Sequence, residues 1–249
     1  MTDHGHGSRG RIDSGEGVCL WTCSRCGHRE FAADHPCSCW CGGELARAAV
    51  RDNSLRPART LADIPDPEWT RVPTSIPELD ELLGGGFVTP GTVLLWGPRG
   101  SGKTTLALRA SRSVRTLLVP LEMSAALYRH TATRAGSELR RIQIGTVDAS
   151  ADSWLRDYRT ARAACLVVDS LGKTADPVVA FERVGRACRE GRVGLVLAIA
   201  HATRDGDARG GPALEHEADV CLIVEPGRLE LAKNRFGATG SASLVWPPL

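Results

Sequence analysis

Lysine is nearly missing from this chain. Of its 31 basic residues, only Lys103, Lys173 and Lys233 are lysines, and the rest are arginines. The formal net charge is only +2, so bulk charge indicates neither a nucleic-acid binder nor a binder of acidic substrates. Because arginine supplies the positive charge nearly everywhere, the three lysines are the more informative basic positions.

Long apolar runs and aromatic residues are scarce as well. No stretch of about 18 apolar residues occurs, which predicts no membrane span, and the N-terminus has no apolar signal segment, which predicts a cytoplasmic protein. Aromatic residues make up 5% of the chain, and none lies between positions 182 and 235. A base-stacking platform for nucleic acid is therefore not expected in that region.

A phosphate-binding signature lies at residues 97–104. It matches the pattern G-x-x-x-x-G-K-[ST], follows the apolar run 92–96 and precedes a helical pattern over 105–113. The glycines let backbone N–H groups turn toward phosphate oxygens, and a helix N-terminus adds positive potential. The sequence predicts a site for a nucleoside triphosphate, ATP or GTP. The predicted binding residues are Gly97, Pro98, Arg99, Gly100, Ser101, Gly102, Lys103, Thr104 and Thr105.

Individual roles within the site follow from side-chain chemistry. Lys103 is expected to reach the β- and γ-phosphates, and Thr104 is expected to bind Mg²⁺. Asp169 ends the apolar run 165–169. A carboxylate at the carboxyl end of a parallel strand can hold Mg²⁺ directly or through water, so Thr104 and Asp169 are the predicted magnesium residues.

Two more polar residues end predicted strands. Glu122 follows the run 116–121 and is the predicted catalytic base, since a carboxylate there can deprotonate the attacking water. The alternative is a charge placed at a helix N-terminus. His201 follows the run 194–200 and is predicted to sense the γ-phosphate, the alternative being an ordinary surface histidine.

Six of the nine cysteines lie between positions 19 and 41. Two closely spaced cysteine groups in a cytosolic protein indicate metal binding rather than disulfides. Four thiolates in two knuckles predict a tetrahedral structural Zn²⁺ site. The predicted ligands are Cys23, Cys26, Cys37 and Cys41, with Cys39 as the alternative to Cys37, and Cys19, His28 and His35 as candidates outside that set.

The composition changes along the chain and predicts its organisation. We expect a disordered tail over 1–17, a zinc ribbon over 18–45, a proline-bearing linker over 46–70 and a core over 71–249. In the core, apolar strand patterns alternate with helical patterns, which predicts an α/β fold with a mainly parallel sheet. The last strand patterns lack intervening helices, so antiparallel edge strands are expected.

Five sequence blocks then occur in one order. They are the cysteine knuckles, RVPTSIPELD at 71–80 with GGG at 84–86, the phosphate loop, HATRDG at 201–206 leading to GPALEH at 211–216, and KNRFG at 233–237. Together they resemble the bacterial RadA (Sms) family of the RecA superfamily, for which KNRFG is distinctive. The resemblance covers about residues 19–249 and implies a RecA-like P-loop core preceded by a zinc ribbon.

The resemblance also implies activity and assembly. In such proteins the ATPase is a ring with its active sites between subunits. We therefore expect a homo-oligomer, most simply a hexameric ring. Lys233 and Arg235 would act in trans on a neighbour's γ-phosphate, and Glu122 would be the base. The segment 203–213 would face single-stranded DNA. The implied function is a DNA-dependent ATPase of homologous recombination or DNA repair.

The chain departs from the family pattern in four places. LEMS at 121–124 replaces Gly-Glu-Glu-Ser, HATR at 201–204 replaces His-Val-Thr-Lys, and the stretch after Asp169 is short. The chain stops at Leu249, where the family continues into a Lon-protease-like domain, so that domain is expected to be absent. One alternative is a KaiC-like regulatory ATPase that docks a protein partner through its zinc ribbon without moving along DNA. Another is a nucleotide-binding assembly module with little turnover.

Overall fold

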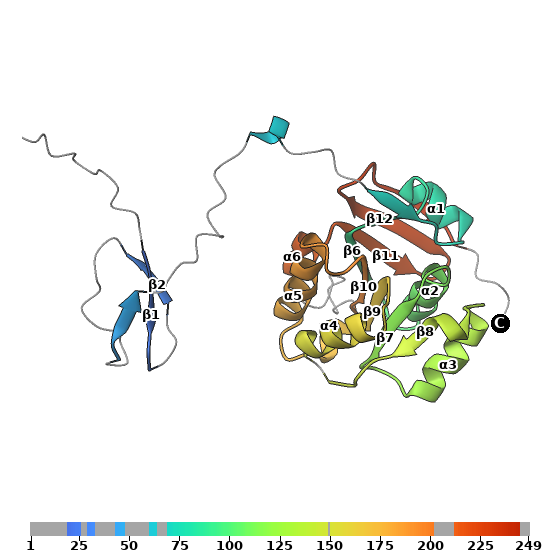
Figure 1. Ribbon diagram of the computed structural model, residues 1–249. Helices are drawn as coiled ribbons and strands as arrows, with labels where there is room; N and C mark the ends of the chain where they lie inside the picture. The colour runs from blue at the N-terminus through green and yellow to red at the C-terminus, as the bar shows by residue number, and fades with distance from the viewer. Residues whose placement is uncertain are drawn as a thin grey trace, which may run out of the picture. The chain divides into compact units, whose positions relative to one another are not determined.

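The chain falls into two compact units, residues 1–66 and 67–249. Each unit is described by itself (Figure 1). The computed structural model describes residues 19–25, 29–32, 43–47, 60–63, 69–148, 150–201 and 212–244.

The first unit contains a small antiparallel sheet in the order β2-β1-β3. Its strands are β1 (Cys19–Cys23), β2 (Arg29–Ala32) and β3 (Leu45–Arg47), and a single 3-10 turn, η1 (Leu61–Asp63), follows. Trp21, Cys23 and Leu45 are its buried apolar side chains among the described residues. So small a core provides little hydrophobic stabilisation.

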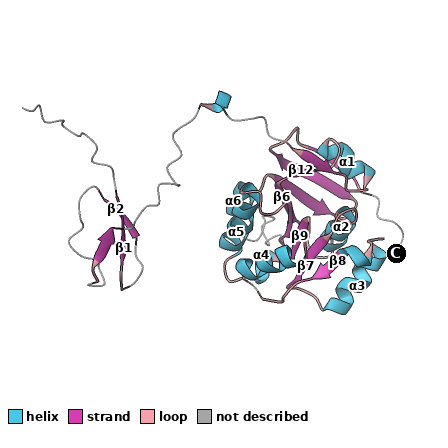
Figure 2. Cartoon of the chain, viewed as in Figure 1, coloured by secondary structure: helices cyan, strands magenta, loops and turns pink. Residues whose placement is uncertain are grey.

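The second unit is built on an eight-stranded sheet in the order β13-β12-β11-β6-β10-β9-β7-β8 (Figure 2). Strands β6 to β11 pair in parallel, whereas β12 and β13 continue the sheet in antiparallel pairing. This arrangement confirms the predicted α/β class with antiparallel edge strands. The strands are β6 (Gly91–Trp96), β7 (Thr116–Pro120), β8 (Ile142–Ile144), β9 (Cys165–Asp169), β10 (Leu195–Ile199), β11 (Val220–Glu225), β12 (Arg228–Asn234) and β13 (Gly240–Ser243).

Helices cover both faces of this sheet (Figure 1). One hydrophobic cluster joins the sheet to α1 (Pro77–Leu83), α2 (Lys103–Ala110) and α3 (Ala125–Arg134). The second joins the other face to α4 (Ala151–Thr160), α5 (Pro177–Arg189) and α6 (Pro212–Glu217). Two one-turn 3-10 helices, η2 (Leu139–Arg141) and η3 (Leu171–Lys173), and the hairpin of β4 (Thr70–Val72) with β5 (Phe87–Thr89) complete the unit.

Local sequence explains where several helices begin. The Ser124 side chain accepts a hydrogen bond from the Leu127 N–H at 3.3 Å and caps α3. Asp176 accepts from the N–H groups of Val178 and Val179, and Pro177 occupies the first position of α5, where its missing N–H costs nothing. Helix α6 was not predicted from the sequence because a segment of six residues is too short to show helical periodicity.

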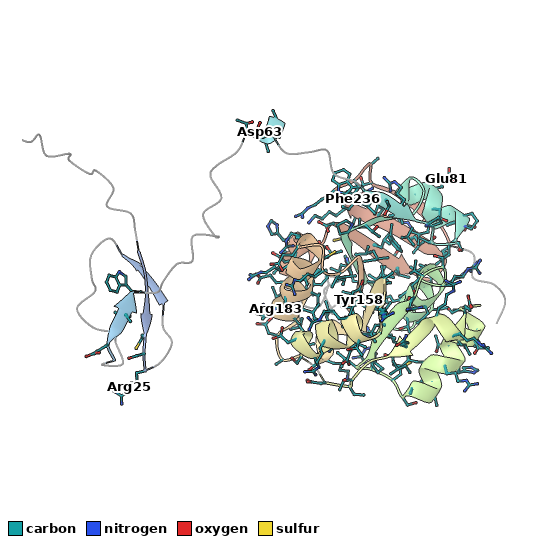
Figure 3. All side chains as sticks on the ribbon, in the orientation of Figure 1. Arg25, Asp63, Glu81, Tyr158, Arg183 and Phe236 are labelled. Atoms are coloured by element: carbon teal, nitrogen blue, oxygen red, sulfur yellow. The ribbon has the colours of Figure 1, made fainter. Side chains whose placement is uncertain are left out.

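The parallel strands place their carboxyl ends along one edge of the sheet. The residues that follow β6, β7, β9 and β10 therefore converge there, although they are far apart in the sequence. Side chains fill both faces of the sheet, and Tyr158 of α4 is among those labelled in Figure 3. Within the part of the chain that is described, no helix has the length and apolar character needed to cross a membrane.

Candidate active site

The phosphate loop connects β6 to α2 and has the backbone geometry that its glycines predict. Gly97, Gly100 and Gly102 have φ values of 150°, 78° and 92°, which side chains rarely allow. A Cβ at Gly97 would lie 2.2 Å from the Val224 carbonyl oxygen, so only glycine fits there. No side chain caps the N-terminus of α2, which leaves its first N–H groups open to an anion.

Lys103 is turned into this loop. Its ammonium group donates to the carbonyl oxygens of Gly97, at 2.9 Å, and Pro98, at 2.6 Å, and the residue is only 4% exposed. Burial lowers the pKa of Lys103, and the nearby carboxylates of Glu122 and Asp169 partly oppose that shift. The lysine is thus held against the backbone that would surround the phosphates.

Asp169 lies at the end of β9 and is fully buried. Its Oδ2 accepts hydrogen bonds from Thr104 Oγ1, at 2.7 Å, and from the Tyr128 hydroxyl, at 3.1 Å. Burial raises the pKa of Asp169, as does the Glu122 carboxylate to a smaller extent, whereas the two hydrogen bonds lower it. Burying a charged carboxylate in this way costs free energy unless a nearby cation balances its charge.

The donor set around Asp169 fits a hard cation. Oδ1 of Asp169 is buried and has no hydrogen-bond partner among the described residues, and Thr104 Oγ1 lies beside Oδ2. Carboxylate and hydroxyl oxygens are the ligands that Mg²⁺ takes, usually together with water and phosphate oxygens. The two residues predicted to hold Mg²⁺ therefore lie together and have a free oxygen to offer.

Glu122 and His201 meet at the same edge, from the ends of β7 and β10. His201 Nε2 lies 3.0 Å from Oε1 and 2.9 Å from Oε2 of Glu122. The Glu122 side chain is 32% exposed, so water can reach it, whereas that of His201 is 14% exposed. The predicted base and the predicted phosphate sensor are in direct contact.

Unsatisfied polar atoms gather around these residues. Among the described residues, every buried side-chain nitrogen or oxygen without a partner follows or ends β6, β9 or β10, or lies in the phosphate loop. They are Trp96 Nε1, Ser101 Oγ, Asp169 Oδ1, Ser170 Oγ and His201 Nδ1. Buried polar groups are normally hydrogen-bonded, so their concentration here indicates a polar ligand site.

Other predicted nucleotide-binding residues occupy the loop and the first turn of α2. Pro98, Arg99 and Gly100 are exposed, whereas Thr105 is half-buried. Arg99 makes no ion pair with any residue that the structure describes, so its guanidinium remains open to solvent. The loop predicted to face DNA, 203–213, lies outside the described residues except for its last two positions, which begin α6.

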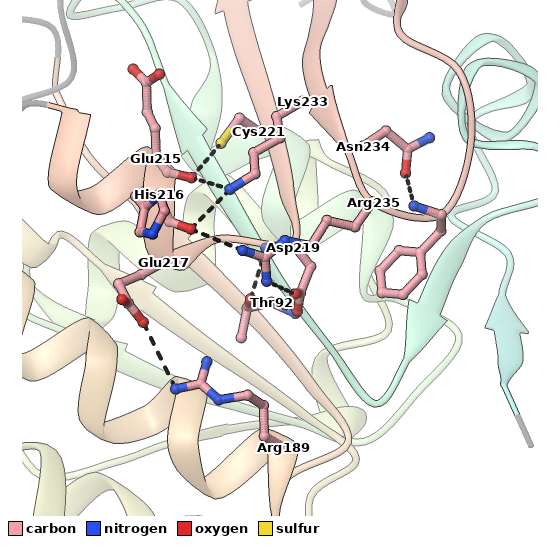
Figure 4. Close-up of polar contacts among 11 residues, drawn as sticks. Thr92, Arg189, Glu215, His216, Glu217, Asp219, Cys221, Lys233, Asn234 and Arg235 are labelled. Atoms are coloured by element: carbon pink, nitrogen blue, oxygen red, sulfur yellow. Dashed lines mark hydrogen bonds and ion pairs between the residues drawn. The ribbon is translucent and has the colours of Figure 1, made fainter. Parts of the chain in front are cut away.

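Lys233 and Arg235 do not lie at the phosphate loop of their own chain. The Lys233 ammonium donates to the carbonyl oxygens of Glu215, at 2.7 Å, and His216, at 2.9 Å (Figure 4). Arg235 donates to the His216 carbonyl at 3.2 Å and to Asp219 Oδ1 at 3.0 Å. Burial first, and then the neighbouring Arg235, lowers the pKa of Lys233.

The sheet register explains this position. Lys233 pairs with Cys221, which in turn pairs with Leu94 in the middle of β6. Cys221 belongs to the cluster under α4, α5 and α6, whereas α2 packs on the other face. The Lys233 side chain thus reaches α6 on the face opposite the helix that carries Lys103.

The predicted zinc ligands fall largely outside the described residues. Cys23 is described, and its sulfur accepts a hydrogen bond from the Arg25 N–H at 3.4 Å. Cys26, Cys37, Cys41 and the alternative Cys39 lie outside the described residues. Among the residues that are described, no group of three or more histidine, cysteine or acidic side chains is placed to hold a metal.

Tyr128 is a site residue that sequence reasoning missed. Its hydroxyl donates toward both the main-chain oxygen of Asp169, at 3.0 Å, and Oδ2. Burial raises the pKa of Tyr128, and the Asp169 carboxylate adds to the shift, so the phenol stays protonated and remains a donor. A tyrosine on a helix carries no local signal for such a contact.

Comparisons with known proteins agree with this geometry. A family model described as "ATPase: KaiC" matches residues 72–165. The "DNA repair protein RadA" of Mycobacterium tuberculosis (strain H37Rv) is 32% identical, and the alignment covers 88% of this chain and 52% of that protein. This chain is thus similar to RadA proteins over most of its own length. The RadA of Pseudomonas aeruginosa is 30% identical over 72% of this chain and 44% of its own length.

Solved structures show the same fold. A KaiC-like protein from Pyrococcus horikoshii OT3 superposes with a TM-score of 0.56 at 24% identity, covering 71% of this chain and 93% of that one. A second solved structure, that of an ATPase domain, gives a TM-score of 0.55 at 20% identity, covering 70% of this chain and 87% of that one. The core is therefore a RecA-like P-loop fold, as the motifs predicted. The chain spans about half the length of the curated relatives it matches.

Proposed function

We propose that this chain hydrolyses ATP in a homo-oligomeric ring and acts in DNA repair or recombination. One observation carries the enzymatic part. The phosphate loop, a buried carboxylate with a free oxygen, and a partly exposed glutamate converge at one edge of the sheet, together with the unpartnered polar atoms of the described residues.

Each residue has a definite part in that reaction. The amides of residues 97–104 and the Lys103 ammonium bind the phosphates, exchanging the loop carbonyls for phosphate oxygens. Thr104 and Asp169 would hold Mg²⁺, and the ion would supply positive charge to the phosphate oxygens. Glu122 takes the proton of the attacking water, whose oxygen bonds to the γ-phosphorus as ADP leaves. His201 orients Glu122 before the γ-phosphate arrives.

The setting of the reaction comes from the relatives. The similar RadA proteins are named DNA repair proteins, and that role is transferred here as a proposal because the chain covers only about half of each of them. Lys233 and Arg235 face away from α2 in their own chain, which supports a role toward a neighbouring subunit. Single-stranded DNA is the proposed activator, and the segment 203–213 its proposed contact.

The second candidate is a regulatory ATPase that binds a protein partner through its cysteine-rich segment. The match of residues 72–165 to the KaiC model favours it. The two candidates share the reaction and differ in what stimulates it. Whether DNA stimulates ATP turnover therefore distinguishes the two candidates, whereas the presence of turnover does not.

The deciding measurement is ATP turnover by the full chain with and without single-stranded DNA, together with its mass in solution with and without Mg·ATP. A stimulation of about tenfold or more by DNA, abolished in Lys103→Ala, is the expected result. Lys173→Ala is the matched control, since Lys173 is an exposed lysine at the end of η3. Turnover that ignores DNA would favour the regulatory candidate, and turnover that persists in Lys103→Ala would overturn the site.

A further inference from the structure

Four strands of the core sheet begin at a row of arginines. β10, β9, β7 and β8 are consecutive in the sheet and parallel, so their amino ends lie along the edge opposite the phosphate loop. The connections that lead into them, each taken from the last turn of the preceding helix, hold eleven arginines and three acidic residues. Their net charge is therefore +8, whereas that of the whole chain is +2. These connections are residues 107–115, 131–141, 157–164 and 186–194.

Hydrogen bonds hold the four connections side by side. The Arg115 carbonyl oxygen, before β7, accepts from the Ala164 N–H at 2.7 Å, and the Ala164 carbonyl oxygen, before β9, accepts from the Leu195 N–H at 3.1 Å. Arg141, before β8, donates to the Ser113 carbonyl oxygen at 3.2 Å. Since neighbouring strands lie about 4.8 Å apart, the four amino ends form a row about 15 Å long.

Most of these arginines have no partner. Seven make neither an ion pair nor a side-chain hydrogen bond with any residue that the structure describes, whereas the other four each pair with one glutamate. Unpaired guanidinium groups gathered in one row repel one another, and an anion lying across them relieves that repulsion. Six of the seven are exposed, and one is half-buried. These seven, the arginine edge, are Arg109, Arg112, Arg115, Arg134, Arg140, Arg159 and Arg162.

Arg162 occupies a position that favours glycine. It follows the end of α4 with a φ of 48°, and its N–H donates to the Arg159 carbonyl oxygen at 3.1 Å. Helices α3 and α5 end in the same kind of turn, but with Gly136 and Gly191 at φ values of 69° and 70°. The left-handed backbone costs an arginine conformational free energy that it does not cost a glycine. The chain thus carries a cation at a point where its backbone geometry favours glycine.

The arginine edge offers charge but no stacking platform. The single aromatic residue of the four connections, Tyr158, is buried, and its hydroxyl accepts from the Gly194 N–H at 3.1 Å. Unpaired bases are usually held by stacking on aromatic side chains, whereas a DNA duplex presents closely spaced phosphates that arginines can contact without reading the bases. The row therefore fits a duplex better than a single strand.

We propose that the arginine edge binds the phosphate backbone of duplex DNA, independently of its sequence. This site goes beyond the proposed function and is separate from both of its sites. Asp169 lies at the far end of β9, roughly 15 Å away along the strand. The segment 203–213, proposed to contact single-stranded DNA, follows the carboxyl end of β10 in the sequence. The protein thus holds a duplex at one edge of its sheet and hydrolyses ATP at the other.

Fluorescence anisotropy of a labelled duplex, titrated with the full chain at several salt concentrations, tests the site. Arg115→Glu should raise the Kd for the duplex by about tenfold and Arg162→Gly by about threefold. Arg162→Gly should also lower the slope of log affinity against log salt by about one, the change for one lost phosphate contact. Arg129→Glu is the matched control, since Arg129 is an exposed arginine of α3 that has no ion pair among the described residues and lies outside the arginine edge.

Arg162→Gly also separates binding from folding. Glycine relieves the left-handed backbone, so the melting temperature of this variant should equal or exceed that of the parent chain. A loss of duplex affinity in a chain of undiminished stability therefore cannot come from a loosened fold. Unchanged duplex affinity and salt slope in Arg162→Gly and Arg115→Glu would overturn the proposal, as would an equal loss in the Arg129→Glu control.

Two further measurements identify the ligand. Affinity for a single strand of the same length that falls as much as duplex affinity would overturn the assignment to duplex DNA. Impaired assembly in Arg115→Glu with unchanged duplex affinity would assign the edge to a contact between subunits instead. Binding at this edge needs no hydrolysis, so Lys103→Ala should bind the duplex as the parent does. Intact duplex binding by a parent chain whose turnover ignores DNA would refute the proposed function alone.

Discussion

The two tyrosines of the chain show how much one hydroxyl group decides. Tyr128 and Tyr158 are both buried and both use the hydroxyl in a hydrogen bond. The Tyr128 hydroxyl donates to the carboxylate of Asp169, whereas that of Tyr158 accepts from the Gly194 N–H at 3.1 Å. Only the first of these bonds fixes a group that is proposed to hold Mg²⁺.

We expect Tyr128→Phe to weaken the use of Mg²⁺ without preventing folding. Loss of a partner that orients a metal ligand typically costs about 10-fold or more in metal affinity or activity, so the Mg²⁺ concentration for half-maximal turnover should rise about tenfold. Tyr158→Phe loses a comparable hydrogen bond, worth about 1 kcal/mol of stability, and serves as the control. Equal Mg²⁺ dependence in both variants would show that Tyr128 is merely structural.

Glu122→Gln should separate binding from hydrolysis. The amide keeps the size of the side chain and its contact with His201, but it cannot accept the proton of water, so turnover should fall by about 100-fold or more. The affinity for Mg·ATP, measured by calorimetry, should stay within about threefold. Glu138→Gln, a change at an exposed glutamate paired with Arg141, is the control. Normal turnover in Glu122→Gln would remove this residue from the reaction.

At the scale of elements, the last turn of α6 depends on side chains from β12. The carbonyl groups at a helix C-terminus lack hydrogen-bond partners within the helix. In α6 these partners are the side chains of Lys233 and of Arg235, which follows β12. Asp219 continues the connection, because its Oδ2 accepts from the N–H and hydroxyl of Thr92 at the start of β6. A short helix is thus fixed to the central strand of the sheet.

The cysteine-rich strands form the other element whose stability is testable. The zinc ribbon predicted from the sequence implies that Cys23→Ser releases one Zn²⁺ per chain and unfolds the segment 18–45, because metal binding supplies folding energy of roughly 10–16 kcal/mol in small zinc domains. Metal is measured by elemental analysis and turnover by phosphate release. The core should keep its basal turnover. Cys188→Ser, at a buried cysteine of α5, is the control, and comparison of Cys37→Ser with Cys39→Ser identifies the fourth ligand.

At the scale of the whole molecule, the ring proposal makes the active site a shared one. Lys233→Ala and Arg235→Ala should leave nucleotide binding near normal and suppress turnover by roughly 10³-fold or more, the scale of cations supplied in trans. Mixing Lys233→Ala with Glu122→Gln chains should restore part of the activity, because some interfaces then pair an intact base with an intact lysine.

Two controls make that mixing experiment decisive. Lys233→Arg keeps a cation that can donate to the α6 carbonyl groups. It tests whether the loss of turnover in Lys233→Ala comes only from a loosened α6. Lost turnover in a Lys233→Arg chain that retains its structure would identify the trans role. Subunit exchange is verified with chains of different size. Mixtures that exchange subunits yet remain as inactive as each variant alone would show that Lys233 acts within its own chain or not at all.

Sequence alone was sufficient where the chemistry is carried by neighbouring residues. The phosphate loop is eight consecutive residues whose glycines fix the backbone, and the apolar runs at 92–96, 116–121 and 165–169 became β6, β7 and β9. The alternation of these runs with helical patterns also predicted the α/β class. The resemblance to RadA rested on blocks of the same local kind, and it was confirmed.

Contacts between distant residues were decided only by the tertiary structure. Glu122 and His201 are 79 positions apart, and Tyr128 and Asp169 are 41 apart. The sequence predicts parallel strands, whose carboxyl ends all lie at one edge of the sheet. It does not predict the order β10-β9-β7, and that order determines which of these ends are neighbours. The same holds for Lys233 on α6 and for the arginine edge, since strand order and register arise from packing the whole sheet rather than from any one segment.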